Sequence, residues 1–383
     1  MTTCPARPTP ARPEGEPVTD EHPDPPPTDD PRWRDALRAV LDDPALHALH
    51  AQPVVDLAAG TVAGYELLSR FTGPWQASPD RWFAAADRWG ANAALQARVL
   101  ERAVARRADL PPHTFLTVNV DPHLLADDRV ADVLGQHADL SRLVLELTEH
   151  SRADDDGRTV LDRARAAGAL VAMDDAGTGY AGLELLLALR PDVVKLDRAL
   201  ISGLDADPVK RALVQVLGDL VGRMDGWILA EGIETAAELD AVVALGVPLG
   251  QGWALGRPGP DLVTDLVPGQ AAHLRATAAR VSLTGAVASV VRPVAAGEDG
   301  GVRLAANGLV QQVRTRAGDW VPAMTVAPSA SVVEVARRAM LRPDQQRWDP
   351  LVCTDANGAV VGVVDLDRVM LALSDEGPDA IVR

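Results

Sequence analysis

The sequence predicts an α/β protein, a (β/α)8 barrel of the TIM type followed by a smaller α+β domain. Short apolar runs alternate with helical segments from about residue 47 to residue 251, a period typical of parallel strands with crossover helices. About eight strands can be counted, and a polar residue lies at the end of nearly every one. An open doubly wound sheet shares this alternation but binds ligands at one switch point, whereas a barrel collects functional groups from many strand ends. The barrel is therefore favoured.

Each element has its own signal. A short amphipathic helix beginning near Arg32 leads to two apolar runs, HALHAQPVVDL and TVAGYELLSRF, and the AAG between them predicts a hairpin. The later apolar runs predict strands at 114–120, 142–147, 169–174, 192–196, 226–231 and 247–251. The segments between them predict helices at 80–108, 122–135, 155–167, 181–189, 207–224 and 235–245.

Composition and charge limit the classes of function. At 383 residues, with 47% hydrophobic and 24% charged residues, the chain is ordinary for a globular protein of more than one domain. The net charge of −17 argues against binding of nucleic-acid polymers or anionic membranes, so metal ions would have to hold an anionic substrate. The two cysteines, Cys4 and Cys353, provide neither a disulfide framework nor a cysteine-type zinc site. Without a long apolar run or a hydrophobic signal segment, we expect no membrane insertion and a cytoplasmic location.

Four segments follow one another along the chain. Residues 1–31 are rich in proline and acids and are expected to form a disordered tail. Residues 32–264 would form the barrel, and the Ala-rich segment 265–280 a helical connector. In 281–383, the runs PAMTVAPSASVVEVARRAM and DPLVCTDANGAVVGVVDLDRVMLAL predict a β-α-β-β-α order with a hairpin that turns at Asn357-Gly358. That order is typical of a compact regulatory domain.

Seven of the apolar runs end in a polar or charged residue, which is the main indication of function. Hard divalent cations such as Mg²⁺ and Mn²⁺ prefer carboxylate and carbonyl oxygens, and the carboxyl ends of parallel strands meet on one face of a barrel. Two such ions about 3.5–4 Å apart can activate a water, clamp a phosphate and stabilise the leaving oxygen, which suits phosphodiester hydrolysis. The residues are Glu66, Asn119, Glu146, Asp174 with Asp175, Lys195, Glu231 and Gln251.

The chemical types of these residues indicate separate tasks. Asp174 could bridge two ions, with Asp175 holding the second. Lys195 could orient the nucleophilic water or neutralise charge growing at phosphorus, and Glu231 could be a ligand or a proton acceptor. Arg70, which follows the first of the glutamates, could contact a substrate phosphate.

Each residue also has a plainer interpretation. A lone glutamate at a strand end is more often a salt-bridge partner than a ligand, and an Asp-Asp pair before Ala-Gly-Thr-Gly can be a turn and a helix cap. Lys195 could pair with Asp197, and Asn119 could cap the helix that begins near Pro122. Glu146 is harder to explain in this way, because a carboxylate flanked by leucines and a valine is costly to bury unpaired. The gathering of several such residues on one face favours a functional site.

Motifs follow one another along the barrel from about Gln52 to Pro258. In order they are QPVVDLAAGTVAGYELLSR, VNVDP, LELTE, MDDAGTGYAGL, PDVVKLD, AEGIET and QGWALGRP. In this order and at this spacing they resemble the motifs of the EAL-domain cyclic-di-GMP phosphodiesterases. The resemblance implies a barrel whose first strand is antiparallel, and hydrolysis of one bond of cyclic di-GMP to linear pGpG with two Mg²⁺ or Mn²⁺ ions. It also implies a homodimer, with the DDAGTG loop linking metal binding to dimerisation.

The resemblance divides the site residues into four groups. The implied metal ligands are Glu66, Asn119, Glu146, Asp174, Asp175, Glu231 and Gln251, the last as the holder of a metal-bound water. The implied catalytic residues are Lys195, Glu231 and Asp175. The residues implied to bind substrate are Gln52, Arg70 and Arg257. Those implied to support the ligands are Glu149, Glu234 and Thr178, of which Glu149 would anchor the DDAGTG loop.

The chain departs from the family pattern at three positions. Leu67 replaces a small residue in the signature Glu-Leu-Leu, while the functional glutamate is kept. Ala176 stands where the family usually has a phenylalanine, so the loop beside the metals lacks an aromatic anchor. Asp121 stands where a serine is common, a change that we expect to be tolerated.

The C-terminal segment resembles half of a CBS-type module, and 281–322 is interpreted as a degenerate first repeat. The Thr and Asp that hold a ribose in nucleotide-binding members correspond here to Asp365 and Arg368, which weakens an adenine-nucleotide role. A small ligand at this domain remains an option beside a packing or dimerisation role.

Three hypotheses for the whole chain follow. The first is an active cyclic-di-GMP phosphodiesterase with a C-terminal regulatory domain, which the complete ligand set favours. The second is a weak or inactive EAL-type receptor that binds cyclic di-GMP and signals through its C-terminal domain, to which Ala176 and Leu67 point. The third is an interaction scaffold whose acidic tail or C-terminal domain is the important surface.

Overall fold

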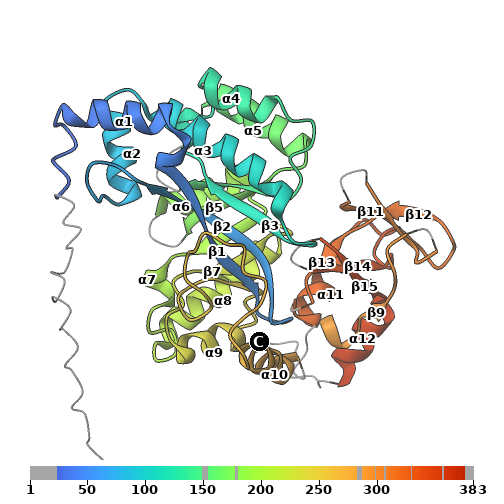
Figure 1. The fold of residues 1–383 in the computed structure, drawn as a ribbon. Helices are drawn as coiled ribbons and strands as arrows, with labels where there is room; N and C mark the ends of the chain where they lie inside the picture. Colours follow the sequence, from blue (N-terminus) through green and yellow to red (C-terminus); the bar gives the residue numbers. More distant parts are fainter. Residues whose placement is uncertain are drawn as a thin grey trace, which may run out of the picture.

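A closed eight-stranded barrel forms the centre of the protein (Figure 1). The structure is a computed structural model that describes residues 24–148, 154–176, 180–282, 287–297, 299–305, 308–328, 330–355 and 358–375. Strands β1 to β8 are hydrogen-bonded in chain order around the barrel, which confirms the predicted fold class. Their bounds are His47–Asp56 (β1), Thr61–Phe71 (β2), Phe115–Asn119 (β3), Leu143–Thr148 (β4), Leu170–Ala176 (β5), Val193–Leu196 (β6), Trp227–Ala230 (β7) and Leu249–Gly250 (β8).

The first strand runs opposite to its neighbours. β1 pairs antiparallel with β2 and with β8, whereas the other neighbouring pairs in the barrel are parallel. A tight turn reverses the chain after Asp56, whose carboxylate accepts hydrogen bonds from the backbone N–H groups of Ala58 and Ala59. Gly60 completes the turn with a φ of +63°, a conformation that favours glycine. The predicted hairpin and the antiparallel first strand are confirmed.

Alternation along the strands fills the barrel with a layer of apolar side chains. Residues two apart on a strand face the same side of the sheet. The residue two positions after an interior apolar residue therefore also points into the barrel, one layer closer to the carboxyl end of the strand. Gly64 leaves room for the ring of Phe115, because a Cβ at this glycine would lie 2.5 Å from that ring. The apolar layer closes the barrel below its mouth. It consists of Val54, Ala63, Phe115, Val144, Ala172, Val193, Leu229 and Leu249.

Helices surround the barrel, and their bounds correct several predicted ranges. The predicted helix 80–108 is two helices, because Gly90 takes a φ of +69° between α2 and α3. The predicted helix 122–135 begins as a separate 3-10 turn, and α4 starts only after Asp127, whose carboxylate caps it. The short helix α7 has no counterpart among the predicted helices. The bounds are Arg32–Asp42 (α1), Pro79–Arg88 (α2), Asn92–Arg106 (α3), Asp128–Gly135 (α4), Asp155–Ala166 (α5), Tyr180–Leu189 (α6), Arg198–Ile201 (α7), Pro208–Gly222 (α8) and Ala236–Ala244 (α9).

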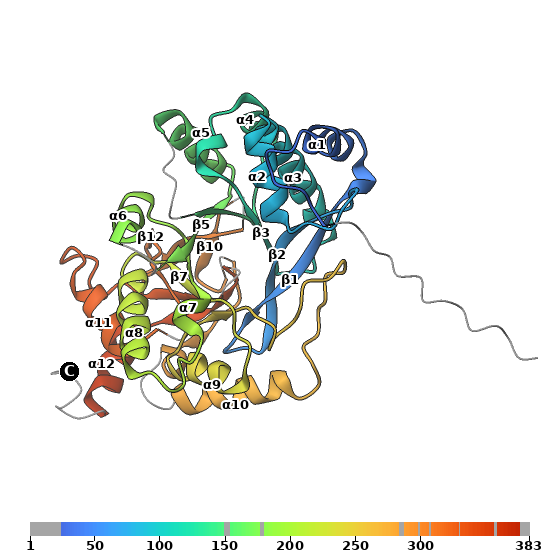
Figure 2. The same cartoon turned by 90° about the vertical axis from the view of Figure 1, so that its left-hand side faces the viewer.

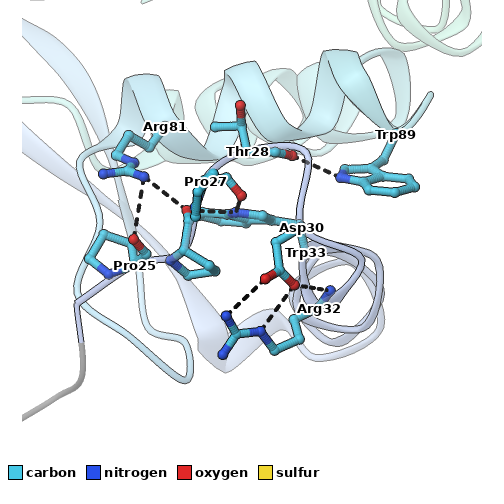
Figure 3. Close-up of polar contacts among 9 residues, drawn as sticks. Pro25, Pro27, Thr28, Asp30, Arg32, Trp33, Arg81 and Trp89 are labelled. Atoms are coloured by element: carbon cyan, nitrogen blue, oxygen red, sulfur yellow. Dashed lines mark hydrogen bonds and ion pairs between the residues drawn. The ribbon is translucent and has the colours of Figure 1, made fainter.

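The end of the expected N-terminal tail is fixed to the helices of the barrel. Residues 24–31, here called the N-terminal strap, lie against α1 and α2, and residues 1–23 lie outside the described residues (Figure 3). Proline has a fixed φ and no N–H, so a proline-rich strap presents its carbonyl oxygens as acceptors in an extended conformation. Residues 24–31 are therefore held in place and do not form part of a free tail, because side chains of the surrounding helices donate hydrogen bonds to these carbonyl oxygens.

Two tryptophans and an arginine supply these donors. The indole N–H of Trp33 donates to the carbonyl oxygen of Pro27 at 3.0 Å, and that of Trp89 donates to the carbonyl oxygen of Thr28 at 2.9 Å. Arg81 donates to the carbonyl oxygen of Pro26 at 2.8 Å (Figure 3). The ring of Trp33 is itself fully buried, so the strap closes over an aromatic core.

A buried histidine lies where β1 begins. The imidazole of His47 is 1% exposed, its Nε2 lies 3.2 Å from the hydroxyl of Ser69, and its ring stacks on Phe71. Burial lowers the pKa of His47 to about 4, and the positive charges of Arg102 and Arg98 act in the same direction. The folded protein therefore holds this side chain in its neutral form.

A second domain follows the barrel through α10 (Gln270–Ser282), which packs beside the β1–β2 turn (Figures 1 and 2). Its four-stranded sheet has the order β13-β14-β15-β9, and a three-stranded sheet has the order β10-β11-β12. The elements β13, α11, β14, β15 and α12 follow in the predicted β-α-β-β-α order. Their bounds are Arg292–Pro293 (β9), Val302–Leu304 (β10), Val310–Arg314 (β11), Trp320–Pro322 (β12), Thr325–Val326 (β13), Val332–Met340 (α11), Leu351–Thr354 (β14), Val360–Val364 (β15) and Leu366–Asp375 (α12).

The four-stranded sheet lies between two layers. Leu351 and Cys353 of β14 pack with the helices on one face, whereas Val352 packs with the three-stranded sheet on the other. The described part of 281–322 contains a three-residue 3-10 helix and strands β9 to β12, so it does not repeat the β-α-β-β-α order. Within the described residues, no helix has both the length and the apolar character needed to cross a membrane.

Replacing Trp89 by phenylalanine should loosen the N-terminal strap. The ring would remain, but the hydrogen bond to Thr28 would be lost, which should lower the free energy of unfolding by about 1 kcal/mol. Urea denaturation of both proteins measures the change. Trp348→Phe, at a tryptophan that is 63% exposed, is the matched control. Equal stability of Trp89→Phe and the wild-type protein would contradict the role of this bond.

The low pKa of His47 should make stability depend on pH. An unfolded histidine binds a proton near pH 6.5, whereas the folded protein resists protonation until about pH 4, so the free energy of unfolding falls as pH drops through this window. In His47→Gln this part of the fall should disappear, a difference of about 1 kcal/mol between pH 7.5 and pH 5.5. Urea denaturation at the two pH values measures it, with the exposed His137→Gln as control. An unchanged pH dependence in His47→Gln would refute the assignment.

Candidate active site at the mouth of the barrel

A polar layer lies above the apolar layer, with Lys195 at its centre. Its side chains come from residues that lie two positions after an apolar residue of the barrel interior. Lys195 lies two residues after Val193, and Glu231 lies two residues after Leu229. On the antiparallel β1 the same layer is reached by Gln52, which pairs with Glu66 across the hairpin. The parallel strands therefore deliver their polar residues to one end of the barrel, as the sequence predicts.

The ammonium of Lys195 contacts four carboxylates from four other strands and strand ends. Its Nζ lies 2.7 Å from Glu231 Oε1, 2.8 Å from Glu146 Oε2, 3.2 Å from Asp174 Oδ1 and 3.6 Å from Glu66 Oε1. The lysine side chain is 2% exposed and that of Glu146 is fully buried. Five residues far apart in the sequence thus form one ion-pair cluster, here called the Lys195 cluster.

The Lys195 cluster carries surplus negative charge, because one ammonium faces four carboxylates. Burial raises the pKa of Glu146 to about 7 against the opposing effect of the lysine, and the neighbouring carboxylates add to the rise. Burial likewise raises the pKa of Glu231 well above its usual value. For Lys195, burial disfavours the charged form, but the four carboxylates outweigh it and raise its pKa. The lysine therefore stays protonated and holds together carboxylates that would otherwise repel one another.

Three amide side chains extend the site toward β1, β3 and the loop after β8. Asn119 Nδ2 donates to Glu66 Oε1 at 3.3 Å. Gln251 Nε2 donates to Glu66 Oε2 and, at 3.2 Å, to Gln52 Oε1. Gln52 Nε2 in turn donates to the carbonyl oxygen of Gly256 at 3.0 Å. Both oxygens of Glu66 are therefore held in place, and a chain of hydrogen bonds joins β2 to the loop after β8.

The donor atoms of this site fit a hard divalent cation. Among the described residues, nothing donates a hydrogen bond to the buried Oε1 of Glu146 or to the buried Oε1 of Gln251. Buried oxygens without a donor are costly, and cations would satisfy them and offset the surplus negative charge. Carboxylate and amide oxygens suit Mg²⁺ or Mn²⁺. In the part of the chain that the structure describes, no three acidic, histidine or cysteine side chains are already set at metal-binding distances, and the carboxylates turn to Lys195 instead.

Two arginines lie near the rim of the mouth. Arg70 is four residues beyond Glu66 on the same face of β2, is half-buried, and donates to the carbonyl oxygen of Ser69 at 2.8 Å. Arg257 lies exposed in the loop after β8, with its guanidinium carbon 4.1 Å from the centre of the Trp253 ring. Both therefore carry positive charge close to the polar layer, on β2 and in the loop after β8.

The remaining predicted site residues are not in the Lys195 cluster. Glu234 accepts a hydrogen bond from Arg198 at 2.8 Å, which fixes the segment that follows Glu231. Glu149 and Thr178 lie outside the described residues, and so does the side chain of Asp175.

Two of the plainer interpretations are wrong. Lys195 is paired with the carboxylates of the cluster, whereas Asp197 accepts the backbone N–H of Ala199 and caps α7. Asn119 donates to a carboxylate and does not cap the turn at Pro122. Both side chains therefore face the mouth of the barrel.

Sequence reasoning missed two residues that shape the site. Gln96 of α3 donates to the carbonyl oxygen of Asn119 at 2.9 Å and accepts from the N–H of Asp121 at 3.3 Å, so it positions the end of β3. A buried glutamine on an otherwise apolar helix face, in NAALQARVL, was the available signal. Thr117 pairs with Glu66 in the register, and nothing among the described residues bonds its buried hydroxyl.

Leu67, the departure in the signature, points away from the mouth. It is 3% exposed and packs in the apolar cluster that includes Leu100 of α3 and Val118 of β3. Alternation along β2 sends Glu66 inward and Leu67 outward, so the larger side chain leaves the site unchanged. Ala176 ends β5 and pairs with Leu196 after a shift in register.

The fold and the site define a TIM-like barrel whose mouth is centred on a buried lysine among carboxylates. Residues 34–258 match the family model described as "EAL domain", and the chain belongs to the EAL domain family. The match covers more than half of the chain and ends before α10. The suspected family is therefore confirmed.

The chain is similar to curated bacterial proteins. It is 29% identical over 217 residues to the probable cyclic di-GMP phosphodiesterase PdeB of Escherichia coli, which covers 54% of this chain and 41% of that protein. It is 30% identical over 220 residues to the probable cyclic di-GMP phosphodiesterase PdeG of the same organism, covering 54% and 43%. The uncharacterized protein y4lL of Sinorhizobium fredii is 31% identical over 239 residues, covering 60% and 29%. The chain spans less than half the length of these relatives.

Solved structures share the barrel. An EAL domain protein from Listeria monocytogenes is 25% identical with a TM-score of 0.53, over 60% of this chain and 92% of that one. A structure described as "PaMucR Phosphodiesterase, c-di-GMP complex" is 30% identical with a TM-score of 0.52, over 60% and 98%. The FimX EAL domain of Xanthomonas citri, at 21% identity and a TM-score of 0.54 over 60% and 94%, supports the fold alone.

Replacing Lys195 by methionine should destabilise the protein strongly. Removing the ammonium would leave four buried or half-buried carboxylates without a cation, at a cost of about 3–5 kcal/mol in the free energy of unfolding. Added Mn²⁺ should recover part of this loss by neutralising the same oxygens. Urea denaturation in EDTA and in Mn²⁺ measures both effects, with Lys210→Met as the control because Lys210 bonds carbonyl oxygens at the surface. A Lys195→Met protein as stable as the wild type would refute the role of the cluster.

Proposed function

We propose that the protein is a divalent-metal-dependent phosphodiesterase that hydrolyses cyclic di-GMP to linear pGpG. The observation that carries this proposal is the buried Lys195 cluster at the mouth of an EAL-family barrel. The names of the two Escherichia coli relatives and the cyclic di-GMP complex of PaMucR support the substrate class.

We assign two Mg²⁺ or Mn²⁺ ions to the oxygen atoms around Lys195. The surplus negative charge and the unbonded oxygens of Glu146 and Gln251 support this assignment. The chemistry that such ions supply is activation of water, neutralisation of the attacked phosphate and stabilisation of the leaving oxygen. The assigned ligands are Glu66, Asn119, Glu146, Asp174, Asp175, Glu231 and Gln251.

The side chains of the protein divide the remaining tasks. Lys195 stays protonated, so its ammonium offers a fixed positive charge to phosphate oxygens as charge grows in the transition state. Glu231, whose Oε1 lies 2.7 Å from the ammonium of Lys195, is assigned to accept the proton of the attacking water, and we assign Asp175 to the same catalytic group. Arg70 and Arg257 bind the substrate at the rim, where their charge attracts phosphate.

Four further residues are assigned to substrate binding or to supporting the ligands. Gln52 joins the floor of the site to the loop after β8 and is assigned to substrate binding. Glu234, held by Arg198, supports the segment after Glu231. On the resemblance alone, Glu149 is assigned to anchor the DDAGTG loop and Thr178 to support the ligands.

A second candidate function is a receptor that binds cyclic di-GMP without turnover. The observation that favours it is Ala176, which removes an aromatic side chain next to the assigned ligands Asp174 and Asp175. The enzyme is preferred, because no carboxylate of the cluster is missing and Leu67 points away from the site.

The domain after the barrel is assigned to regulation or dimerisation. We assign residues 32–264 to the barrel domain, 265–280 to the connector and 281–383 to the second domain, and we infer a homodimer. The β13-α11-β14-β15-α12 order supports a CBS-like half module, with room for a small ligand as a proposal only. An ion pair between Arg338 of α11 and Asp225 joins this domain to the barrel, a contact through which a signal could pass.

One assay tests the activity. Purified protein is incubated with cyclic di-GMP and Mn²⁺, and pGpG is followed by chromatography. Glu66→Gln should lower turnover about 100-fold or more, because it removes the charge of a central ligand while keeping its shape. Glu101→Gln, at an exposed glutamate of α3, is the control and should retain full activity.

The outcomes separate the two candidate functions. Binding of cyclic di-GMP by the wild-type protein without product supports the receptor and rejects the enzyme. Neither binding nor product rejects both. Full turnover by Glu66→Gln would reject the ligand assignment.

A further inference from the structure

A tryptophan and an arginine form a flat, exposed pair in the loop after β8. The side chain of Trp253 is 54% exposed, and the guanidinium of Arg257 lies over one face of its ring at 4.1 Å from the ring centre. Among the described residues, Arg257 has no carboxylate partner in ion-pair contact. An unpaired arginine is unexpected in a protein of net charge −17, since acidic residues are abundant.

The loop that carries this pair is rigid. Gly252 takes a φ of +154° and lies so close to the backbone of Ile233 that a side chain could not be accommodated. The N–H of Gly256 bonds the carbonyl oxygen of Gly252 at 2.9 Å, which closes one helical turn. That turn places residues 253 and 257 on the same side, four positions apart. The Trp253–Arg257 pair therefore has its shape before any ligand binds.

The same loop is bonded directly to the polar layer of the mouth. The carbonyl oxygen of Gly256 accepts from Gln52, which in turn accepts from Gln251 at 3.2 Å. Gln251 also donates to Glu66, a member of the Lys195 cluster. The Trp253–Arg257 pair thus lies at the edge of the candidate active site, after β8, which neighbours β1 in the barrel.

A packing role does not account for the position of Trp253. A tryptophan gains stability by burying its ring, yet more than half of this side chain is in contact with solvent. With one face covered by a guanidinium, the ring offers a flat apolar surface beside a positive charge. The chemical partner that matches both is a planar nucleobase attached to a phosphate, because bases stack on indole rings and arginine binds phosphate.

We propose that Trp253 is a base-stacking residue, which holds one guanine of the cyclic dinucleotide at the rim while Arg257 contacts the adjoining phosphate. This inference rests on the proposed function, because it names how the same site holds its substrate. Trp253 touches a base and no reacting atom, so it contributes to binding and not to the chemical step. The base would stack on the ring equally well in the ground state and in the transition state. The stacking therefore lowers the free energy of both states alike and strengthens binding without accelerating the chemical step.

The test compares binding and turnover in three variants of the full chain. Trp253→Ala removes the ring, Trp253→Phe keeps a smaller ring, and Trp348→Ala removes an exposed tryptophan of the C-terminal domain as the matched control. Binding of cyclic di-GMP is measured by calorimetry in Ca²⁺ or in EDTA, and KM and kcat are measured in Mn²⁺. Circular dichroism verifies that each variant is folded.

Stacking predicts a distinct pattern. Trp253→Ala should weaken binding and raise KM roughly 5- to 100-fold with kcat changed less than about twofold, because loss of a base–aromatic stack costs that much affinity. Trp253→Phe should recover most of the affinity, and Trp348→Ala should equal the wild type. Binding should also quench tryptophan fluorescence less in Trp253→Phe than in the wild type.

The outcomes distinguish this inference from the proposed function. If the wild-type protein binds cyclic di-GMP and Trp253→Ala binds it with the same dissociation constant, the stacking role is overturned and the proposed function stands. A fall in kcat at unchanged KM also overturns it, since this would place Trp253 in the chemical step. Absence of cyclic di-GMP binding by the wild-type protein overturns both.

Discussion

The protein depends on one contact, the ammonium of Lys195 among four carboxylates. Without that charge nothing in the cluster would oppose the repulsion among carboxylates that lie within a few ångströms of one another in a buried site. With it, β2, β4, β5, β6 and the segment after β7 are joined at the mouth of the barrel. The single ammonium offsets only part of the negative charge, and the remainder gives the site its affinity for cations. Stability and the proposed chemistry therefore arise from the same imbalance.

The two layers inside the barrel explain how the cluster can exist. Valine, leucine, alanine and phenylalanine side chains fill the lower layer and exclude water from below, and the residues two positions further along carry the polar groups. Because both layers come from the same strands, packing in one fixes position in the other. Gly64 and Phe115 illustrate this coupling, since the ring occupies the space that a side chain at residue 64 would need.

The parts outside the barrel are attached by hydrogen bonds and ion pairs of particular side chains. Trp33, Trp89 and Arg81 donate to the carbonyl oxygens of the N-terminal strap, and Arg338 pairs with Asp225 across the contact with the second domain. The loop after β8 is held in the same way, through Gln52 and Gly256.

The sequence by itself determined the class of fold and the candidate site, because the two-residue period of strands and the polar residue at each strand end are local signals. It also predicted the hairpin that joins β1 to β2, through the short AAG between the two apolar runs. Only the tertiary structure decided which partners those residues take. Lys195 pairs with carboxylates of other strands and not with its neighbour Asp197, and Leu67 faces the outer core, because barrel closure sets contacts between residues far apart in the chain. The fixed strap, the break at Gly90 and the exposed Trp253 depend on such distant partners and on backbone conformation, which no periodicity reports.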